Sequence, residues 1–108
     1  MFELKQKEGS DQYHFVLKAK NGQVILSSQV YASKSGAMNG IESVRKNASD
    51  DSKFERKTAK NGKFFFNLKA ANSQVIGTSQ MYAAEAGMEN GIESIKNNAP
   101  GADVKEAE

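Results

Sequence analysis

One short motif contains the residue types from which a catalytic site could be built. The segment Asn-Gly-Ile-Glu-Ser occurs at 39–43 and again at 90–94, so that Glu42 and Glu93 each recur beside an asparagine and a serine. A glutamate without a histidine, a cysteine or a second carboxylate nearby makes a poor case for acid–base catalysis. Neither glutamate has such a neighbour in its motif, and a carboxylate on a helix surface is usually just solvated. We therefore expect no acid–base catalysis at this motif.

The rest of the composition removes most other kinds of catalytic or metal site. The chain has no cysteine and a single histidine, His14. This excludes a thiolate nucleophile, a disulfide and a cysteine metal site, and makes a histidine-based metal site implausible. No glycine pattern matches a phosphate-binding loop. We expect no catalytic residue, no metal and no cofactor, and hence no enzyme, although a site made of carboxylates or backbone groups alone stays open.

The segment 53–69 combines basic and aromatic residues. It has six basic residues against one acidic residue, interleaved with four phenylalanines. Aromatic rings beside lysines on a sheet can stack bases and neutralise phosphates, as in sequence-tolerant single-strand binding. The plainer alternative is that three phenylalanines belong to the core, the lysines are solvated, and only Phe65 is exposed. No RNP-type motif, KH loop or helix-turn-helix spacing accompanies the segment, so we favour the plainer interpretation.

These features belong to a unit that the chain contains twice. Residues 18–48 align without a gap with residues 69–99, and 18 of the 31 aligned positions are identical. The match extends upstream, where FELKQ at Phe2 corresponds to FERKT at Phe54 once a one-residue difference in the following turn is allowed. A unit of about fifty residues is at the lower margin of independent folding. We therefore expect the two copies to share one core around a pseudo-twofold axis.

Length and charge narrow the class of protein. A chain of 108 residues fits one domain, and its net charge of +2 argues against a dedicated binder of duplex DNA. It contains no apolar run of the length of a signal peptide or a membrane span, so we expect a cytoplasmic protein. The expected organisation is a single domain over 1–108, with repeat one at about 1–51, repeat two at about 52–102 and an acidic tail at about 103–108.

Each repeat is expected to contain three strands followed by one helix. In the middle strand, alternation with period two predicts one set of side chains on the core face. These core sets are Tyr13, Phe15, Leu17 and Ala19 in the first repeat and Phe64, Phe66, Leu68 and Ala70 in the second. The pair Asn21-Gly22 predicts a hairpin turn. Ser73 replaces that glycine in repeat two, and a positive φ would cost serine about 1 kcal/mol, so a different turn type is open there.

The apolar pattern then changes to a helical period. Spacings of four, three and four predict one apolar stripe on each helix. The stripes are Ala37, Ile41, Val44 and Ala48, and Met88, Ile92, Ile95 and Ala99. Ser33 can cap the first helix, whereas its counterpart is Ala84, so we expect the second helix to begin less sharply. A short strand through Val104 is expected before the acidic tail frays.

The glycines of these helices need a compensating role, because glycine inside a helix costs about 1 kcal/mol relative to alanine. Glycines four residues apart share a face, where a neighbouring helix or strand could approach closely, and the asparagines and serines could hydrogen-bond its backbone. We interpret the motif as repeat packing, with a ligand site as the alternative. The packing set is Gly36, Asn39, Gly40, Glu42 and Ser43 with Gly87, Asn90, Gly91, Glu93 and Ser94. Glu42 and Glu93 could face each other across the axis.

The tyrosines that precede the helices form another symmetric pair. Tyr31 and Tyr82 fall between the third strand and the helix of their repeats. At such a place a tyrosine ring can cover the edge of the core while its hydroxyl stays wet. We interpret both as structural contacts, with a groove framed by the pair as the alternative.

The strand ending in LKA, the following QVI and SQ-x-YA segments and above all Asn-Gly-Ile-Glu-Ser resemble the YegP-like, DUF1508 or UPF0339, family of small bacterial proteins of unknown function. The resemblance covers almost the whole chain and both repeats, as in the tandem form of the family. It implies an α+β fold with one antiparallel sheet from both repeats, helices packed on it, and a strand after each helix exchanged across the pseudo-dyad. It implies no established activity and no catalytic residue.

We predict a small binding or protein-interaction module, with the side of the sheet away from the helices as the contact surface. The candidate contact residues are His14, Val16, Lys18, Lys63, Phe65, Asn67 and Lys69. Exposed apolar groups with a polar rim often mark contacts. The alternative is weak single-stranded nucleic-acid binding by the same face, which the near-neutral charge makes less favourable than a protein partner. No membrane partner is expected, and because the second repeat supplies a symmetric partner, we expect a monomer.

Overall fold

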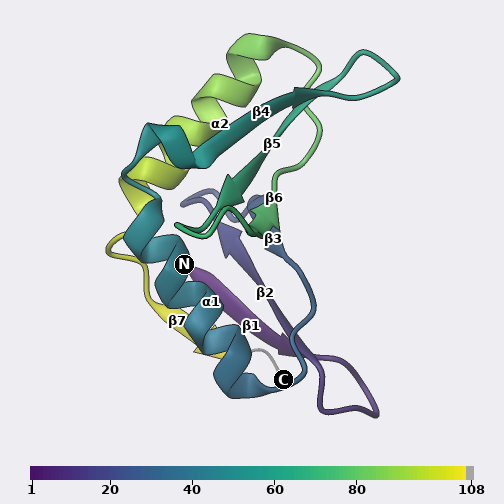
Figure 1. Ribbon diagram of the computed structural model, residues 1–108, viewed down its shortest axis with the longest axis vertical. Coiled ribbons are helices and arrows are strands. Elements are labelled where there is room, and N and C mark those ends of the chain that lie inside the picture. Colours follow the sequence, from purple (N-terminus) through teal and green to yellow (C-terminus); the bar gives the residue numbers. More distant parts are fainter. Residues whose placement is uncertain (107–108) are drawn as a thin grey trace.

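The structure is a computed structural model that describes residues 1–106, and two helices pack on one seven-stranded sheet (Figure 1). Repeat one contributes β1 (Phe2–Gln6), β2 (Tyr13–Lys18), β3 (Val24–Ser28) and α1 (Lys34–Asn47). A short 3-10 helix η1 (Asp51–Lys53) leads into β4 (Phe54–Thr58), β5 (Phe64–Lys69), β6 (Val75–Thr78), α2 (Glu85–Asn98) and β7 (Val104–Glu106). The α+β class and the repeated unit are confirmed. Residues 107 and 108 of the expected acidic tail lie outside the described residues.

The strand order of the sheet, β4-β5-β6-β3-β2-β1-β7, contains the expected pseudo-symmetry. The two repeats meet where β3 and β6 pair antiparallel, with Ser27 opposite Thr78. These two residues occupy equivalent positions of the two repeats, so the pseudo-twofold axis passes between them. The outer strands β1 and β4 are consequently equivalent to each other.

The last strand departs from the expected antiparallel sheet. β7 pairs in parallel with β1, with Val104 beside Phe2, so that the sheet is mixed. The strand after the second helix is thus exchanged onto the first repeat, as the resemblance implied. After α1, in contrast, η1 leads straight into β4, and within residues 1–106 no strand lies on the outer side of β4. The exchange is therefore present on one side only.

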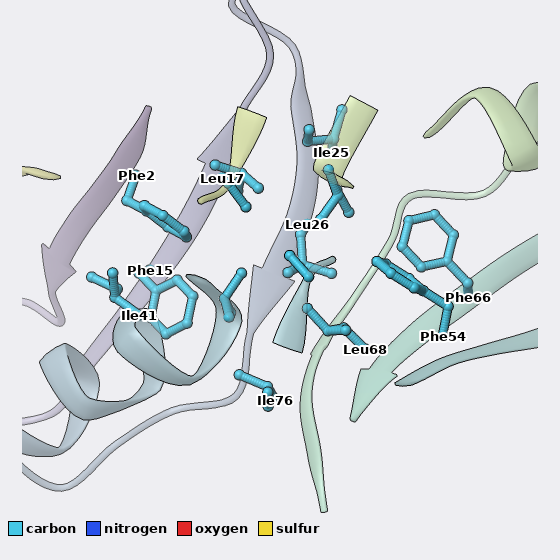
Figure 2. Close-up of a cluster of buried hydrophobic side chains, with 14 of the residues drawn as sticks. Phe2, Phe15, Leu17, Ile25, Leu26, Ile41, Phe54, Phe66, Leu68 and Ile76 are labelled. Atoms are coloured by element: carbon cyan, nitrogen blue, oxygen red, sulfur yellow. The ribbon is translucent and has the colours of Figure 1, made fainter. Parts of the chain in front are cut away.

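The core lies between the sheet and the helices, and both repeats share it. The predicted stripe residues of both helices are all buried. Figure 2 shows the buried cluster extending from Phe2 and Phe15 through Leu26 to Leu68 and Phe66. Burying a side chain of this size contributes about 1.5–3 kcal/mol. Because the cluster is continuous across the axis, neither half has a separate core.

Two local expectations are corrected. Ser73 has a φ of 69°, close to the 83° of Gly22, and both turns close with the corresponding backbone hydrogen bond. The second turn therefore keeps the type of the first, and Ser73 carries a strain of about 1–2 kcal/mol. Similarly, α2 begins at the residue equivalent to the start of α1, although Ala84 makes no side-chain cap bond and Ser33 does.

Candidate functional site

The face of the sheet away from the helices carries a continuous row of side chains. The strand registers align Lys105, Glu3, Val16, Ser27, Thr78, Asn67 and Glu55 across all seven strands. Residues in register point to the same face, and Val16 lies outside the buried core cluster. We define the open face as this row together with seven further residues. Six of them, Lys5, His14, Lys18, Lys57, Phe65 and Lys69, lie on the same strands, and Lys63 lies in the turn before β5.

Near each end of the row, a glutamate is bound by two lysines. Nζ of Lys18 lies 2.9 Å and Nζ of Lys5 lies 3.4 Å from the carboxylate of Glu3. The equivalent lysines flank Glu55 at 2.9 and 3.8 Å. The hydrogen bonds from Lys18 and Lys69 are the main cause that lowers the pKa of these two carboxyls. Because each glutamate is paired with two lysines, the open face keeps a surplus of positive charge.

The predicted contact residues of the open face are not equally accessible. Val16 exposes only 5% of its surface, because Glu3 and Ser27 flank it in register. Phe65 is half-buried rather than exposed, and Lys63 is exposed. His14, Lys18, Asn67 and Lys69 are half-buried as well. The expectation of an exposed apolar pair at these positions is therefore wrong, and the surface is mainly polar.

The two halves of the row differ in chemistry. The side-chain amide of Asn67 donates to Oε1 of Glu55 at 3.2 Å and its oxygen accepts from Oγ1 of Thr78 at 2.7 Å. The equivalent of Asn67 in the first repeat is the apolar Val16. A partner could therefore distinguish one half of the open face from the other.

In each helix, the space beside the motif glycine is filled by a tyrosine ring. We had expected the backbone of a neighbouring helix or strand there. Gly40 is buried beneath Tyr31, whose ring stacks on Phe15 with centroids 6.1 Å apart and planes at 13°. Gly91 lies in the same way beneath Tyr82. The interpretation of the tyrosines as structural contacts is confirmed. The hydroxyl of Tyr82, however, is buried and has no hydrogen-bond partner within residues 1–106, so the expectation that it stays wet is wrong for this ring.

The other polar residues of the motif act within their own helices. The amide of Asn47 donates to the backbone oxygen of Ser43 at 2.8 Å and to its hydroxyl at 3.3 Å, and the equivalent bonds occur in α2. Asn39 and Asn90 are exposed. The expected hydrogen bonds from the serines to an approaching backbone are therefore replaced by bonds along each helix.

The two glutamates of the motif lie on the helix surface. Glu42 forms an ion pair with Arg45, and Glu93 with Lys96 at 3.5 Å, each one turn further along the same helix. Both carboxylate side chains are about two-thirds exposed, at 63% and 64%. This is the geometry of a solvated surface pair, and pairing of the two glutamates across the axis finds no support.

A groove of about 210 Å³ lies where α1 faces the second repeat. Its polar lining comes from Gln29, Tyr31, Asn39, Ser43, Asn72 and Gln74. The groove is smaller than the roughly 300–1,000 Å³ of typical ligand pockets. Sequence reasoning missed it, because no pattern links the helix with residues 72–74 of the other repeat.

An ionic cluster lies at the outer edge of β4. Nε of Arg56 donates to Glu89 at 2.6 Å, and its Nη2 donates to Asp51 at 3.1 Å. Nζ of Lys96 lies 2.6 Å from the same Asp51 carboxylate. The hydrogen bonds from Lys96 and then Arg56 lower the pKa of Asp51 to about 2. The cluster links η1, β4 and α2.

This cluster predicts acid sensitivity. Because the pKa of Asp51 falls from 3.8 to about 2 on folding, its stabilisation is complete above pH 3.8 and is lost as the pH falls through about 2. We expect the urea midpoint to decrease over this range, and the decrease to be smaller in Asp51→Asn. Urea unfolding at pH 6 and near pH 2, roughly the two sides of this window, measures the difference. Asp11→Asn, in the first hairpin loop, is the control. An unchanged pH dependence in Asp51→Asn would contradict the assignment.

Two further properties concern metals and membranes. Within residues 1–106, no three His, Cys, Asp or Glu side chains lie close enough to hold a metal ion. Neither helix in this part of the chain is long and apolar enough to cross a membrane.

Two tandem repeats that share one sheet and one core define a small α+β repeat protein. The family described as "Domain of unknown function (DUF1508)" matches residues 2–55 and again residues 59–106. The chain therefore belongs to the DUF1508 family, as its motifs indicated.

Relatives and solved structures agree over nearly the full length. A UPF0339 protein of Acinetobacter baylyi is 58% identical over 106 residues, which cover 97% of this chain and 94% of the relative. The UPF0339 protein YegP of Escherichia coli is 53% identical over 105 residues, with the same coverage. The solution NMR structure of a UPF0339 protein from Shewanella oneidensis superposes with a TM-score of 0.91 at 51% identity and covers 97% of this chain and 88% of that one. The E. coli yegP structure, with a TM-score of 0.90 at 52% identity and 97% and 90% coverage, is that of a protein of unknown function. The relatives indicate no specific activity and give no sign of catalysis.

Proposed function

We propose that this protein is a binding module without enzymatic activity that contacts another protein through the open face. The observation that carries the proposal is the group of lysines around the half-buried Phe65. Lys57 lies opposite Phe65 in register, and Lys63 and Lys69 lie two residues before and four residues after it in the chain. Since the glutamates of the face are already balanced, an acidic partner surface gains charge-assisted contacts there.

The packing of the helical motif supports this choice of surface. Gly40 and Gly91 are filled by tyrosine rings, and Ser43 and Ser94 are engaged within their helices. The motif glutamates stand as solvated surface pairs, so they offer no acid–base machinery. A substrate screen in which turnover is abolished by Glu42→Gln or Glu93→Gln would contradict the absence of enzymatic activity.

The proposed module acts as a monomer in the cytoplasm, without a metal or a cofactor. The second repeat supplies the symmetric half that a single-repeat protein would need from a second chain.

The test of the contact surface is a variant at its centre. Phe65→Ser is expected to reduce capture of a protein partner from cell extract by about tenfold, as for other central aromatic contacts. Val30→Ser is the control, because Val30 is an exposed apolar residue outside the open face and should leave capture unchanged. Circular dichroism and urea unfolding confirm that both variants fold. Equal capture by the wild type and Phe65→Ser would contradict the proposal.

A second candidate function is weak, sequence-tolerant binding of single-stranded nucleic acid. The same aromatic ring among lysines favours it, since bases stack on rings and phosphates bind ammonium groups. Titration of isotope-labelled protein with an oligonucleotide at low and at moderate salt separates the two functions. Salt-sensitive shifts confined to residues 14–18 and 63–69 would favour nucleic acid. Absence of shifts there, with a protein partner lost in Phe65→Ser, favours the proposed module, and absence of both would contradict both functions.

A further inference from the structure

The equivalent outer strands of the two repeats differ in what covers them. β7 lies parallel to β1, and its residues Val104, Lys105 and Glu106 lie beside Phe2, Glu3 and Leu4. β4, the equivalent of β1, lies at the opposite edge of the sheet, and within residues 1–106 no strand covers its outer side (Figure 1). The pairing of β1 with β7 is thus a template for what the β4 edge can bind.

The backbone of β4 is placed for such pairing. The N–H of Phe2 donates to the carbonyl of Asp103 at 2.8 Å, so the backbone groups of every second residue from Phe2 point toward β7. The equivalent groups on β4 belong to Phe54, Arg56 and Thr58. The Phe54 N–H is taken by a carbonyl of η1. The Phe54 carbonyl and the groups of the other two residues remain at the edge.

A cavity of about 150 Å³ lies at the place that Glu106 occupies in the first repeat. On β1, Glu106 lies beside Leu4 and forms an ion pair with Lys34 at the start of α1. The equivalents of Leu4 and Lys34 are Arg56 and Glu85, and both line the cavity. Lys57, Thr58, Phe64 and Met88 complete the lining. The charge at the start of the helix is therefore reversed between the two edges.

The charge that a ligand would meet follows from these contacts. Arg56 is held by Glu89 and Asp51, so its charge is already engaged. Glu85 lies in the first turn of α2. A cationic side chain that enters the cavity can pair with Glu85 as Glu106 pairs with Lys34.

We propose that the outer edge of β4 binds an extended segment of another protein in parallel, with an apolar residue beside Phe54 and a lysine or arginine beside Arg56, where its cation reaches Glu85. Main-chain hydrogen bonds of strand addition supply affinity, and the basic residue supplies selectivity. The C-terminal strand of a second copy is a poor ligand, because its Glu106 would face Glu85. The edge shares strand β4 and Lys57 with the open face but does not include Phe65, so each proposal has its own test.

Two peptides that differ at one residue test this site. GADVKE copies residues 101–106, and GADVKK carries Glu106→Lys. Each is titrated, capped at both ends, into isotope-labelled full-length protein. We expect GADVKK to shift the amides of residues 54–58 and 85–88. It should bind about 3- to 10-fold more tightly than GADVKE, because its last lysine pairs with Glu85 whereas the glutamate of GADVKE is repelled by it. β1 stays covered, because β7 is tethered to it within the chain.

Charge reversal on the protein makes the test specific. Glu85→Lys is expected to invert the order of the two peptides, whereas Glu93→Lys, on the exposed surface of the same helix, should preserve it. A GADVKK analogue that is N-methylated at its first lysine should lose binding, since it cannot donate to the edge. Absence of shifts at residues 54–58 at millimolar peptide, shifts confined to β1, or an order unchanged by Glu85→Lys would each overturn the proposal.

Discussion

Gly40→Ala is expected to lower the free energy of unfolding by about 1–3 kcal/mol, the usual cost of overpacking. The loss is expected although alanine is favoured over glycine in a helix by about 1 kcal/mol. A Cβ at Gly40 would lie 2.7 Å from Cζ of Tyr31, still closer to its hydroxyl, and 2.9 Å from Cε2 of Phe15. Because Tyr31 is stacked on Phe15, it can make room only by leaving its place on the helix.

Urea unfolding of matched glycine variants measures this effect. Gly36→Ala is the control, because a Cβ at Gly36 meets nothing closer than 3.4 Å. It should be neutral or slightly stabilising. Gly91→Ala should cost less than Gly40→Ala, since the nearby atom of Phe66 lies 3.4 Å away. Equal effects at Gly36 and Gly40 would contradict the packing role of the motif.

The second large effect is expected at the pseudo-twofold axis. Gly77 occupies the position equivalent to Leu26, and a Cβ there would lie 2.9 Å from the backbone oxygen of Ser27 and 3.0 Å from Cγ of Leu26. One leucine thus fills the space near the axis that two symmetric leucines would overfill. Gly77→Leu is expected to cost about 1–3 kcal/mol through overpacking.

A swap of the two residues tests this explanation. Leu26→Gly alone should cost at least the roughly 2–5 kcal/mol typical of truncating a buried leucine to alanine. The double variant Leu26→Gly/Gly77→Leu moves the leucine across the axis, so its cost should be lower than the sum of the single costs by about 0.5–3 kcal/mol. Urea unfolding of the four proteins completes the cycle. Strict additivity would contradict the shared space.

The duplication made the fold predictable from sequence. Two aligned copies of the same period-two and helical patterns identified the strands, the apolar stripes and the shared core. The parallel pairing of β7 was not predictable, because Val104 and its neighbours form a segment too short to specify its direction. The turn type at Ser73 was left open for a different reason, since the surrounding hairpin imposes a positive φ that serine alone disfavours.

The candidate sites were only partly predictable. The period-two pattern of the middle strands predicted on which face of the sheet Val16 and Phe65 lie. Their exposure, however, depends on cross-strand neighbours, which bury Val16 and half-bury Phe65. The need of the helix glycines for close packing was predicted, whereas the partner, a tyrosine of the same repeat, required the tertiary structure. The charge reversal between Lys34 and Glu85 is visible in the aligned repeats, and it gained meaning only when Glu106 was found beside Lys34.

Photo-crosslinking from defined positions tests the central claim most directly, namely that a protein partner contacts the open face and not the helical motif. A photoreactive phenylalanine analogue is placed at position 65 in one protein and at position 39, on the exposed side of α1, in another. We predict a discrete crosslinked protein from position 65 that excess unlabelled wild type competes away and excess Phe65→Ser does not. A crosslinked partner obtained only from position 39 would contradict the account.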